Sequence, residues 1–220
     1  MKKLIYSLSI VILFSCSNEN NNNENVNSKH NQLNTNFRLN ENDQLIANQI
    51  SEEAKFIELV IEMQSFKDYI AQKIELNNLT LADVQSELEA LNDLNLNYED
   101  QIAEINNIYK ENVEQRYNEH LSIYNNTWFY IKEKYEIEDI EILEEASFLV
   151  AQRYLSADVG CGWRYYLCIG AATAAAVLCH GGCNTTALAT TAGLGIPACV
   201  WACGTIQISM SVGCYDNYCD

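Results

Sequence analysis

CHGGCNTTALATTAGLGIPACVWAC, residues 179–203, has a Cys-x-x-x-Cys pair at each end and no charged side chain between them. Four more cysteines flank this stretch, and all eight positions are nearly mirrored about Thr191. Two antiparallel arms in register place mirrored positions opposite one another, so the symmetry predicts a hairpin closed by four nested disulfides. The predicted bridges are Cys183–Cys199, Cys179–Cys203, Cys168–Cys214 and Cys161–Cys219.

The spacing of cysteines along each arm indicates helices rather than strands. Cys168 and Cys179 are eleven positions apart, so on a strand they would point to opposite faces. On a helix with about 3.6 residues per turn, the same spacing is close to three turns and places both on one stripe. Cys219 falls off the stripe of the second arm, so the outermost bridge is expected at a non-helical end.

The expected helical arms are 163–187 and 197–213. Gly193 and Gly195 suit the chain reversal between them, and Pro197 suits the first turn of the second helix.

Small residues must line the seam of such a hairpin. Disulfides require Cα atoms about 4.4–6.8 Å apart, which is closer than the roughly 8–10 Å between most packed helices. The register places three small residues opposite larger ones: Ala172 and Met210, Ala175 and Gln207, and Gly181 and Trp201.

The first 16 residues, MKKLIYSLSIVILFSC, read as a secretion signal: two lysines and then an apolar run too short for a spanning helix. Leu13-Phe14-Ser15-Cys16 resembles a bacterial lipoprotein cleavage site. The resemblance implies that residues 1–15 are removed, that Cys16 is lipidated, and that the lipid anchors the protein in the bacterial cell envelope. The outer membrane or cell surface is expected rather than the inner membrane. The alternative is an ordinary signal peptide that contains a cysteine.

Residues 16–40 are rich in asparagine and almost free of large apolar side chains, so we expect a flexible tether after the lipidated cysteine. Residues 41–157 follow as an acidic helical domain, because residues 41–156 lack glycine and proline and apolar residues recur at helical spacing. Thr80, with Asp83 three residues later, predicts an N-terminal cap. The fold class is therefore all-α: an antiparallel bundle followed by the hairpin of residues 158–220. The expected bundle helices are 42–76, 81–94, 98–126, 128–136 and 138–155.

The acidic domain shows no pattern of a catalytic or cofactor site, and we predict neither. His120 lacks the spacing of a metal motif, Glu144 and Glu145 are expected on solvated faces, and Trp128 is expected in the core. The formal charge of −17 argues against nucleic acid as a partner, because that partner needs a basic surface.

Two Cys-x-x-x-Cys pairs also suit a four-cysteine zinc site, with His180 as a further ligand. Export and four further cysteines in matching register favour disulfides instead, so no metal is expected. Paired cysteines leave no free thiolate to act as a nucleophile, and the protein is not expected to be an enzyme. His180 points away from the cysteine stripe and is expected at the surface.

The hairpin has no formally charged side chain from Tyr165 to Tyr215, and each arm is long enough to approach the thickness of a bilayer. Two outcomes fit: the hairpin packs against the acidic bundle as a core element, or it is membrane-active and kept soluble by the bundle. Aromatic residues gather where the two arms end, as at membrane interfaces. They are Trp163, Tyr165, Tyr166, Tyr215 and Tyr218.

The stretch Cys179-x-x-Gly182-Cys183 … Gly193-Leu194-Gly195-Ile196-Pro197 … Cys199 resembles halocin-like bacteriocins, and the two Cys-x-x-x-Cys pairs resemble the α-hairpinin frame. The first resemblance implies that the hairpin is an effector and that the acidic domain shields it, with a target membrane as partner. The alternative is a non-catalytic surface or periplasmic lipoprotein that binds another envelope component, such as an envelope protein, and uses the hairpin as structure.

Overall fold

The computed structural model describes residues 39–94, 96–137, 139–155, 160–188 and 196–219, so Cys16 and nearly all of the tether lie outside the described residues. The described residues form eight α-helices and no strand, which confirms the all-α prediction. The helices are α1 (Glu41–Glu52), α2 (Ala54–Leu76), α3 (Leu81–Asp93), α4 (Tyr98–Tyr109), α5 (Glu114–Tyr135), α6 (Ile140–Tyr154), α7 (Trp163–Leu188) and α8 (Pro197–Tyr218).

Side-chain caps fix where several of these helices begin. The Thr80 hydroxyl accepts the backbone N–H of Asp83 at 3.2 Å, which confirms the predicted cap of α3. Asn97 accepts the backbone N–H of Asp100 at 2.9 Å and starts α4 in the same way.

The single helix expected over 42–76 is wrong, because the chain breaks at Glu53. This residue is extended, with φ −68° and ψ 123°, and separates α1 from α2. Its carboxylate accepts hydrogen bonds from Lys134 and from the Tyr135 hydroxyl on α5. A contact from a distant part of the chain thus accompanies a break that no local glycine or proline signals.

The helices expected over 98–126 and 128–136 are also wrong. Helix α4 ends at Tyr109, and Lys110 adopts a left-handed conformation with φ 55°. The Asn106 side chain then accepts the backbone N–H of Val113 at 2.9 Å, an alternative to the helical backbone bond. Helix α5 begins after this turn and runs without interruption through Trp128.

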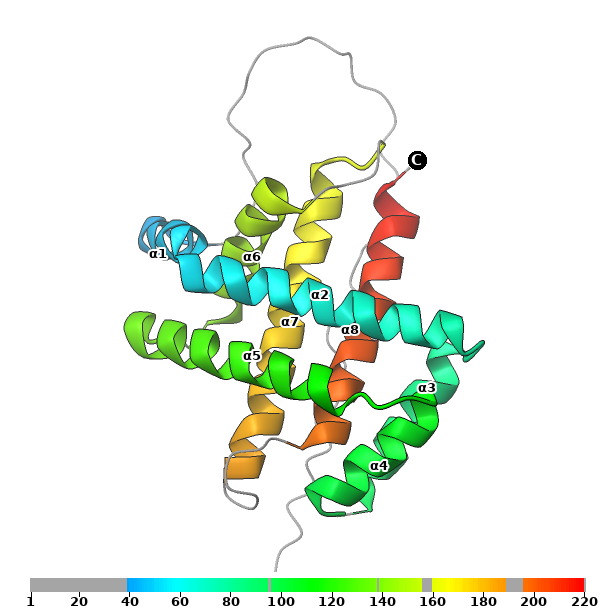
Figure 1. Cartoon of the computed structure of the whole chain (residues 1–220). Helices are drawn as coiled ribbons and strands as arrows, with labels where there is room; N and C mark the ends of the chain where they lie inside the picture. The colour runs from blue at the N-terminus through cyan, green and yellow to red at the C-terminus, as the bar shows by residue number, and fades with distance from the viewer. Residues whose placement is uncertain (1–38, 95, 138, 156–159, 189–195, 220) are drawn as a thin grey trace, which may run out of the picture. The chain divides into compact units, whose positions relative to one another are not determined.

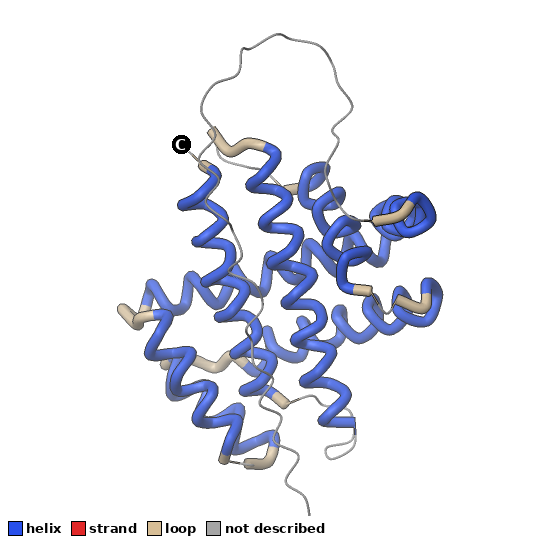
Figure 2. The backbone as a smooth tube through the Cα atoms, turned by 180° about the vertical axis from the view of Figure 1, so that it is seen from behind, coloured by secondary structure: helices blue, strands red, loops and turns tan. Residues whose placement is uncertain are grey.

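Helices α2 and α5 lie side by side and cross the hairpin of α7 and α8, as Figure 1 shows. Helix α6 packs along α7, and α1 packs against α6. Helices α3 and α4 pack against α8 on the side away from α7, which the view from behind in Figure 2 also shows.

Both arms of the hairpin contribute to the hydrophobic core. Trp201 of α8 is fully buried, with its ring 4.8 Å from that of Tyr109 and 5.2 Å from that of Phe66. Ala174 and Val177 of α7 pack in a second cluster with residues of α1, α2, α5 and α6. Residues Phe37–Asp220 form one compact unit, so the change in composition near residue 158 does not separate two cores.

The structure joins the same four cysteine pairs that the mirrored spacing predicts. The Cα–Cα distances are 5.7 Å for Cys183–Cys199, 5.8 Å for Cys179–Cys203, 5.6 Å for Cys168–Cys214 and 4.2 Å for Cys161–Cys219. The outermost bridge lies beyond both helices, because α7 begins after its first cysteine and α8 ends just before its second. Helix α8 reaches Tyr218, five residues beyond the expected end at 213.

The seam differs from the prediction at Gly181. A Cβ added there would first meet the Tyr124 hydroxyl at 3.2 Å and Trp128 Nε1 at 3.3 Å, so Gly181 faces α5 and not Trp201. A closer approach occurs at Gly170, where a Cβ would lie 2.6 Å from the backbone nitrogen of Phe148 on α6. Glycines of α7 therefore admit close packing of the acidic helices.

Candidate functional site

A buried polar network links α2, α5 and the hairpin. Arg116 Nη1 donates to Glu62 Oε1 at 2.7 Å, and His120 Nδ1 lies 2.8 Å from the same oxygen. His120 Nε2 lies 2.9 Å from Nδ1 of His180 on α7. One continuous chain of polar contacts thus runs from the partly buried Arg116 guanidinium to His180, near the closed end of the hairpin.

The network is enclosed by aromatic rings. His120 is fully buried, His180 is 1% exposed and Glu62 is 8% exposed. The Phe66 ring stacks on His120 with centroids 3.9 Å apart and meets His180 edge-on at 6.1 Å. The predicted surface position of His180 is therefore wrong, since the face of α7 opposite the cysteines is covered by α2 and α5.

Two more buried hydrogen bonds tie the hairpin to the same helices. The Tyr124 hydroxyl of α5 donates to the backbone carbonyl of Val177 at 2.6 Å. The Gln64 amide of α2 donates to the Thr173 hydroxyl at 2.6 Å. Buried polar groups that are satisfied in this way fix one relative position of the helices, since any shift leaves donors or acceptors unpaired.

Opposing effects set the charges of the network. Burial raises the pKa of Glu62, but hydrogen bonds from His120 and Arg116 outweigh it and leave the pKa below its usual value. Burial lowers the pKa of His120 despite the nearby Glu62 carboxylate. Burial lowers the pKa of His180 well below its usual value, and His120 adds to the effect while the Val200 backbone opposes it. At neutral pH the network therefore holds a carboxylate, a guanidinium and two neutral imidazoles.

These charges fix the tautomers. The Glu62 carboxylate only accepts, so His120 carries its proton on Nδ1 and its Nε2 accepts from Nδ1–H of His180. The other nitrogen of His180, Nε2, meets no side-chain partner among the described residues, and the Val200 backbone acts on the same ring. Most polar atoms of the network bind one another beneath the aromatic rings. The network therefore holds α2, α5 and α7 together, and its stability depends on protonation of the histidines.

Sequence reasoning missed this network because its members are far apart in the chain. Glu62 and His120 are separated by 58 positions, and His120 and His180 by 60. The one available signal was two histidines on predicted helices, each without a metal motif.

Glu144 and Glu145 were expected on solvated faces, and that prediction fails for Glu145. Its side chain lies in the buried face of α6, where the residue is 4% exposed. Burial raises its pKa, and its Oε2 has no partner among the described residues. Trp128 is buried as predicted, and the helical tyrosines Tyr109, Tyr117 and Tyr124 are buried as well.

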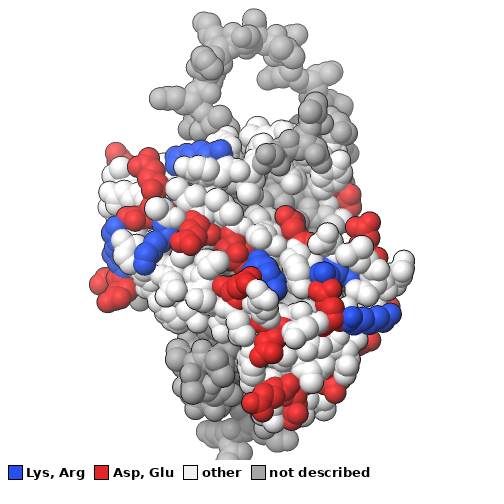
Figure 3. Space-filling model, viewed as in Figure 1, with Lys and Arg blue, Asp and Glu red and all other residues white. Residues whose placement is uncertain are grey.

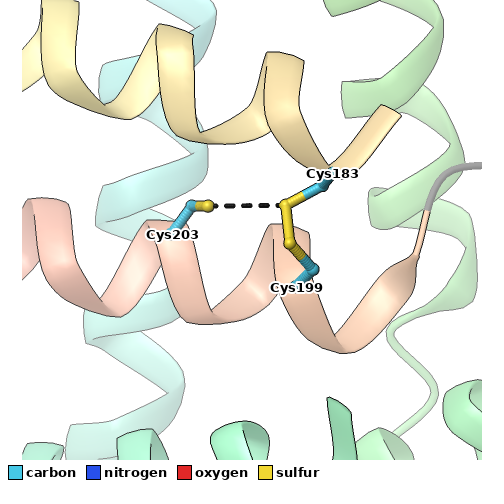
Figure 4. A group of neighbouring side chains, drawn as sticks. All are labelled: Cys183, Cys199 and Cys203. Carbon is cyan, nitrogen blue, oxygen red and sulfur yellow. Dashed lines mark hydrogen bonds between the residues drawn. A yellow bond between two sulfur atoms is a disulfide. The ribbon is translucent and has the colours of Figure 1, made fainter. Parts of the chain in front are cut away.

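A cluster of sulfur atoms lies at the closed end of the hairpin. Figure 4 shows the Cys183–Cys199 bridge beside Cys203, whose own bridge goes to Cys179. Cys183 Sγ and Cys203 Sγ, which belong to different bridges, are 3.6 Å apart. The two inner bridges are therefore in contact with one another.

The open end of the hairpin, residues 160–168 and 209–219, is more exposed than the closed half. Trp163 is 42% exposed, Val212 52% and Tyr215 45%, and Met210 is also exposed. Of the other predicted end aromatics, Tyr165, Tyr166 and Tyr218 are half-buried. Figure 3 shows acidic side chains spread over the face that it displays, with lysine and arginine among them.

Two helices are long and apolar enough to cross a membrane: Trp163–Cys183 and Pro197–Tyr218. Half of each apolar window is buried inside the protein, and a core helix of a soluble protein has the same properties.

Comparison of the chain with protein-family models, with curated proteins and with solved structures finds no match in any of the three.

Proposed function

We propose that the protein is a non-catalytic lipoprotein of the bacterial cell envelope that binds an envelope protein through the open end of its hairpin. In this proposal Cys16 carries the lipid anchor, residues up to 40 form the tether, and the closed half of the hairpin is structural. The observation that carries it is the contrast along the hairpin: the rest of the hairpin contributes to the two large hydrophobic clusters, whereas the open end shares only a small third cluster around Cys214 and presents Trp163, Val212 and Tyr215 to solvent.

The chemistry of this end favours a protein as partner. Aromatic residues and methionine are enriched in protein interfaces, and exposed apolar patches mark interaction sites. The chain has a formal charge of −17, which gives it no electrostatic attraction to anionic lipid.

Affinity isolation from envelope extract tests the binding surface. The variant Trp163→Ala/Tyr215→Ala is expected to lose a partner that the unmodified protein retains. The matched control is Leu76→Ala/Leu94→Ala, because both leucines are 64% exposed elsewhere on the protein. The same set of captured proteins for all three forms would reject the open end as the binding surface.

Metabolic labelling with a fatty acid tests the anchor separately. The unmodified protein should carry the label and sediment with membranes, and Cys16→Ser should lose both properties. Label that persists in Cys16→Ser would overturn the proposed lipidation.

A second candidate is a shielded, bacteriocin-like hairpin that acts on a target membrane. The observation in its favour is that Trp163–Cys183 and Pro197–Tyr218 each have the length and hydropathy of a spanning helix. Action on a membrane would require α8 to withdraw Trp201 from its hydrophobic cluster. It would also require α7 to break the hydrogen bond between His180 and His120.

Release of dye from liposomes distinguishes the second candidate from the first. Trp201→Ala removes the largest fully buried side chain of the hairpin and should loosen the bundle around it. If the hairpin is a shielded effector, this variant releases dye faster than the unmodified protein, with its disulfides intact. Equal and negligible release by the variant and by the isolated oxidised fragment 159–220 would rule out the second candidate.

A further inference from the structure

The inner cysteines bring three sulfur atoms together at the closed end of the hairpin, and the fourth, that of Cys179, is bonded to one of them. Cys179 and Cys183 lie on α7, and Cys199 and Cys203 lie on α8, each pair four residues apart. That spacing places both members of a pair on one helical face. The Sγ atoms of Cys183, Cys199 and Cys203 lie within 4.8 Å of one another.

The distances between these sulfurs suit a tetrahedral metal ion. Zinc–thiolate bonds are about 2.3 Å long, so neighbouring sulfurs of a four-thiolate site are about 3.8 Å apart. Cys183 Sγ and Cys203 Sγ, which belong to different bridges, already lie 3.6 Å apart, along the dashed line in Figure 4. Opening the two bridges requires each bonded pair to separate from about 2 Å to about 3.8 Å.

We propose that Cys179, Cys183, Cys199 and Cys203, when reduced, form a four-thiolate site for one zinc ion. Reduction of the two bridges takes two electrons and two protons per bridge from a dithiol, which becomes a disulfide. Zinc then binds as the four thiols release their four protons. The oxidised and metal-bound forms exclude each other, because the same sulfurs make both sets of bonds.

The surroundings support an inner site rather than a surface one. Cys183 and Cys203 are each 2% exposed, whereas Cys179 and Cys199 are half-buried and give an ion access from solvent. The site adds to the proposed envelope role and does not depend on it.

Cobalt binding to the full chain tests the proposal, since four-thiolate cobalt has intense visible bands that six-coordinate cobalt lacks. The test protein carries serine at Cys16, Cys161, Cys168, Cys214 and Cys219, so that only the inner cysteines remain, and is reduced with a phosphine. We expect one cobalt ion per chain with the tetrahedral spectrum, displaced by one equivalent of zinc. Adding Cys183→Ser should weaken cobalt binding by more than about 100-fold, because a direct ligand is lost.

The matched control keeps the outer cysteines and carries serine at Cys16 and at the four inner positions. Equal cobalt affinity in the two proteins, a six-coordinate spectrum, or no binding to the inner-cysteine protein would overturn the proposal. Far-UV circular dichroism covers the case in which the reduced protein loses helix. Cobalt must then restore the helical signal in the inner-cysteine protein alone, and failure to do so also overturns the site.

Discussion

At the residue scale, Gly170 shows how closely the hairpin approaches the acidic helices. A Cβ at this position would lie 2.6 Å from the Phe148 nitrogen and 2.7 Å from its Cα, and both are backbone atoms that cannot turn aside. Gly170→Ala should therefore lower the free energy of unfolding by about 1–3 kcal/mol. Gly213→Ala is the control, because nothing lies within 4 Å of its Cβ, and alanine in a helix should raise stability by about 0.5–1 kcal/mol. Urea titration measures both, and a neutral Gly170→Ala would contradict the close packing.

The buried histidines predict that the protein loses stability in mild acid. The pKa values of His120 and His180 are both lowered in the folded state, so the unfolded chain binds protons first as the pH falls below about 6.5. The stabilisation is complete above that pH and is lost as the pH falls toward the folded pKa values. Urea titrations between pH 8 and pH 5 should show that the free energy of unfolding falls before the carboxyl groups titrate.

The variant His180→Asn separates this effect from the rest of the protein. The asparagine amide can still donate to His120 Nε2 but does not titrate. The loss of stability between pH 7 and pH 5 should become smaller, since the buried imidazole whose pKa is lowered more strongly is gone. An unchanged acid loss would mean that other groups cause it. Glu144 and Glu145, whose pKa values are raised by burial, work in the opposite direction at lower pH.

At the element scale, the disulfides differ in what surrounds them. Removing Cys168–Cys214 with alanines should cost about 2–5 kcal/mol, because Cys214 is fully buried against Ala151 and Ile169. Loop entropy favours the outermost bridge only slightly: 58 residues separate its cysteines and 46 the other pair, a difference of roughly 0.2 kcal/mol. Cys161→Ala/Cys219→Ala, at the partly exposed ends, should therefore cost less. Thermal unfolding measures the melting temperatures of the two variants. A lower melting temperature for Cys161→Ala/Cys219→Ala than for the variant without Cys168–Cys214 would show that chain entropy outweighs packing.

Also at this scale, the hairpin was predictable from sequence and the bundle only in part. Local sequence patterns predict the cysteine pairing, the start of α8 at Pro197 and the cap at Thr80. The break at Glu53 does not, because its carboxylate is held by Lys134 and Tyr135 from another helix. The same limit applies to the polar network: His180 looks like a surface residue until α2 and α5 are placed over its face of α7.

At the scale of the whole molecule, the charge should make stability depend on salt. The chain carries 30 acidic and 13 basic side chains, so its exposed carboxylates repel one another. Raising the ionic strength from about 0.02 M to about 0.2 M shortens the screening length from roughly 20 Å to roughly 7 Å and should raise the melting temperature.

A triple variant tests this origin of the salt effect. Glu58→Gln/Glu75→Gln/Glu87→Gln removes three exposed charges that make no side-chain ion pair among the described residues. Its melting temperature at low salt should be higher than that of the unmodified protein, and its rise with salt should be smaller. An identical salt response would show that repulsion among carboxylates is not the cause.

The nested bridges also restrict how the gene can change. One residue added within an arm would rotate everything beyond it by about 100° about the helix axis, so cysteines on one side of the addition would no longer face their partners. A residue added between the arms, anywhere from 189 to 195, leaves every facing pair opposite its partner. Insertions and deletions should therefore collect in that connection among descendants of this chain, while the two arms change only by substitution.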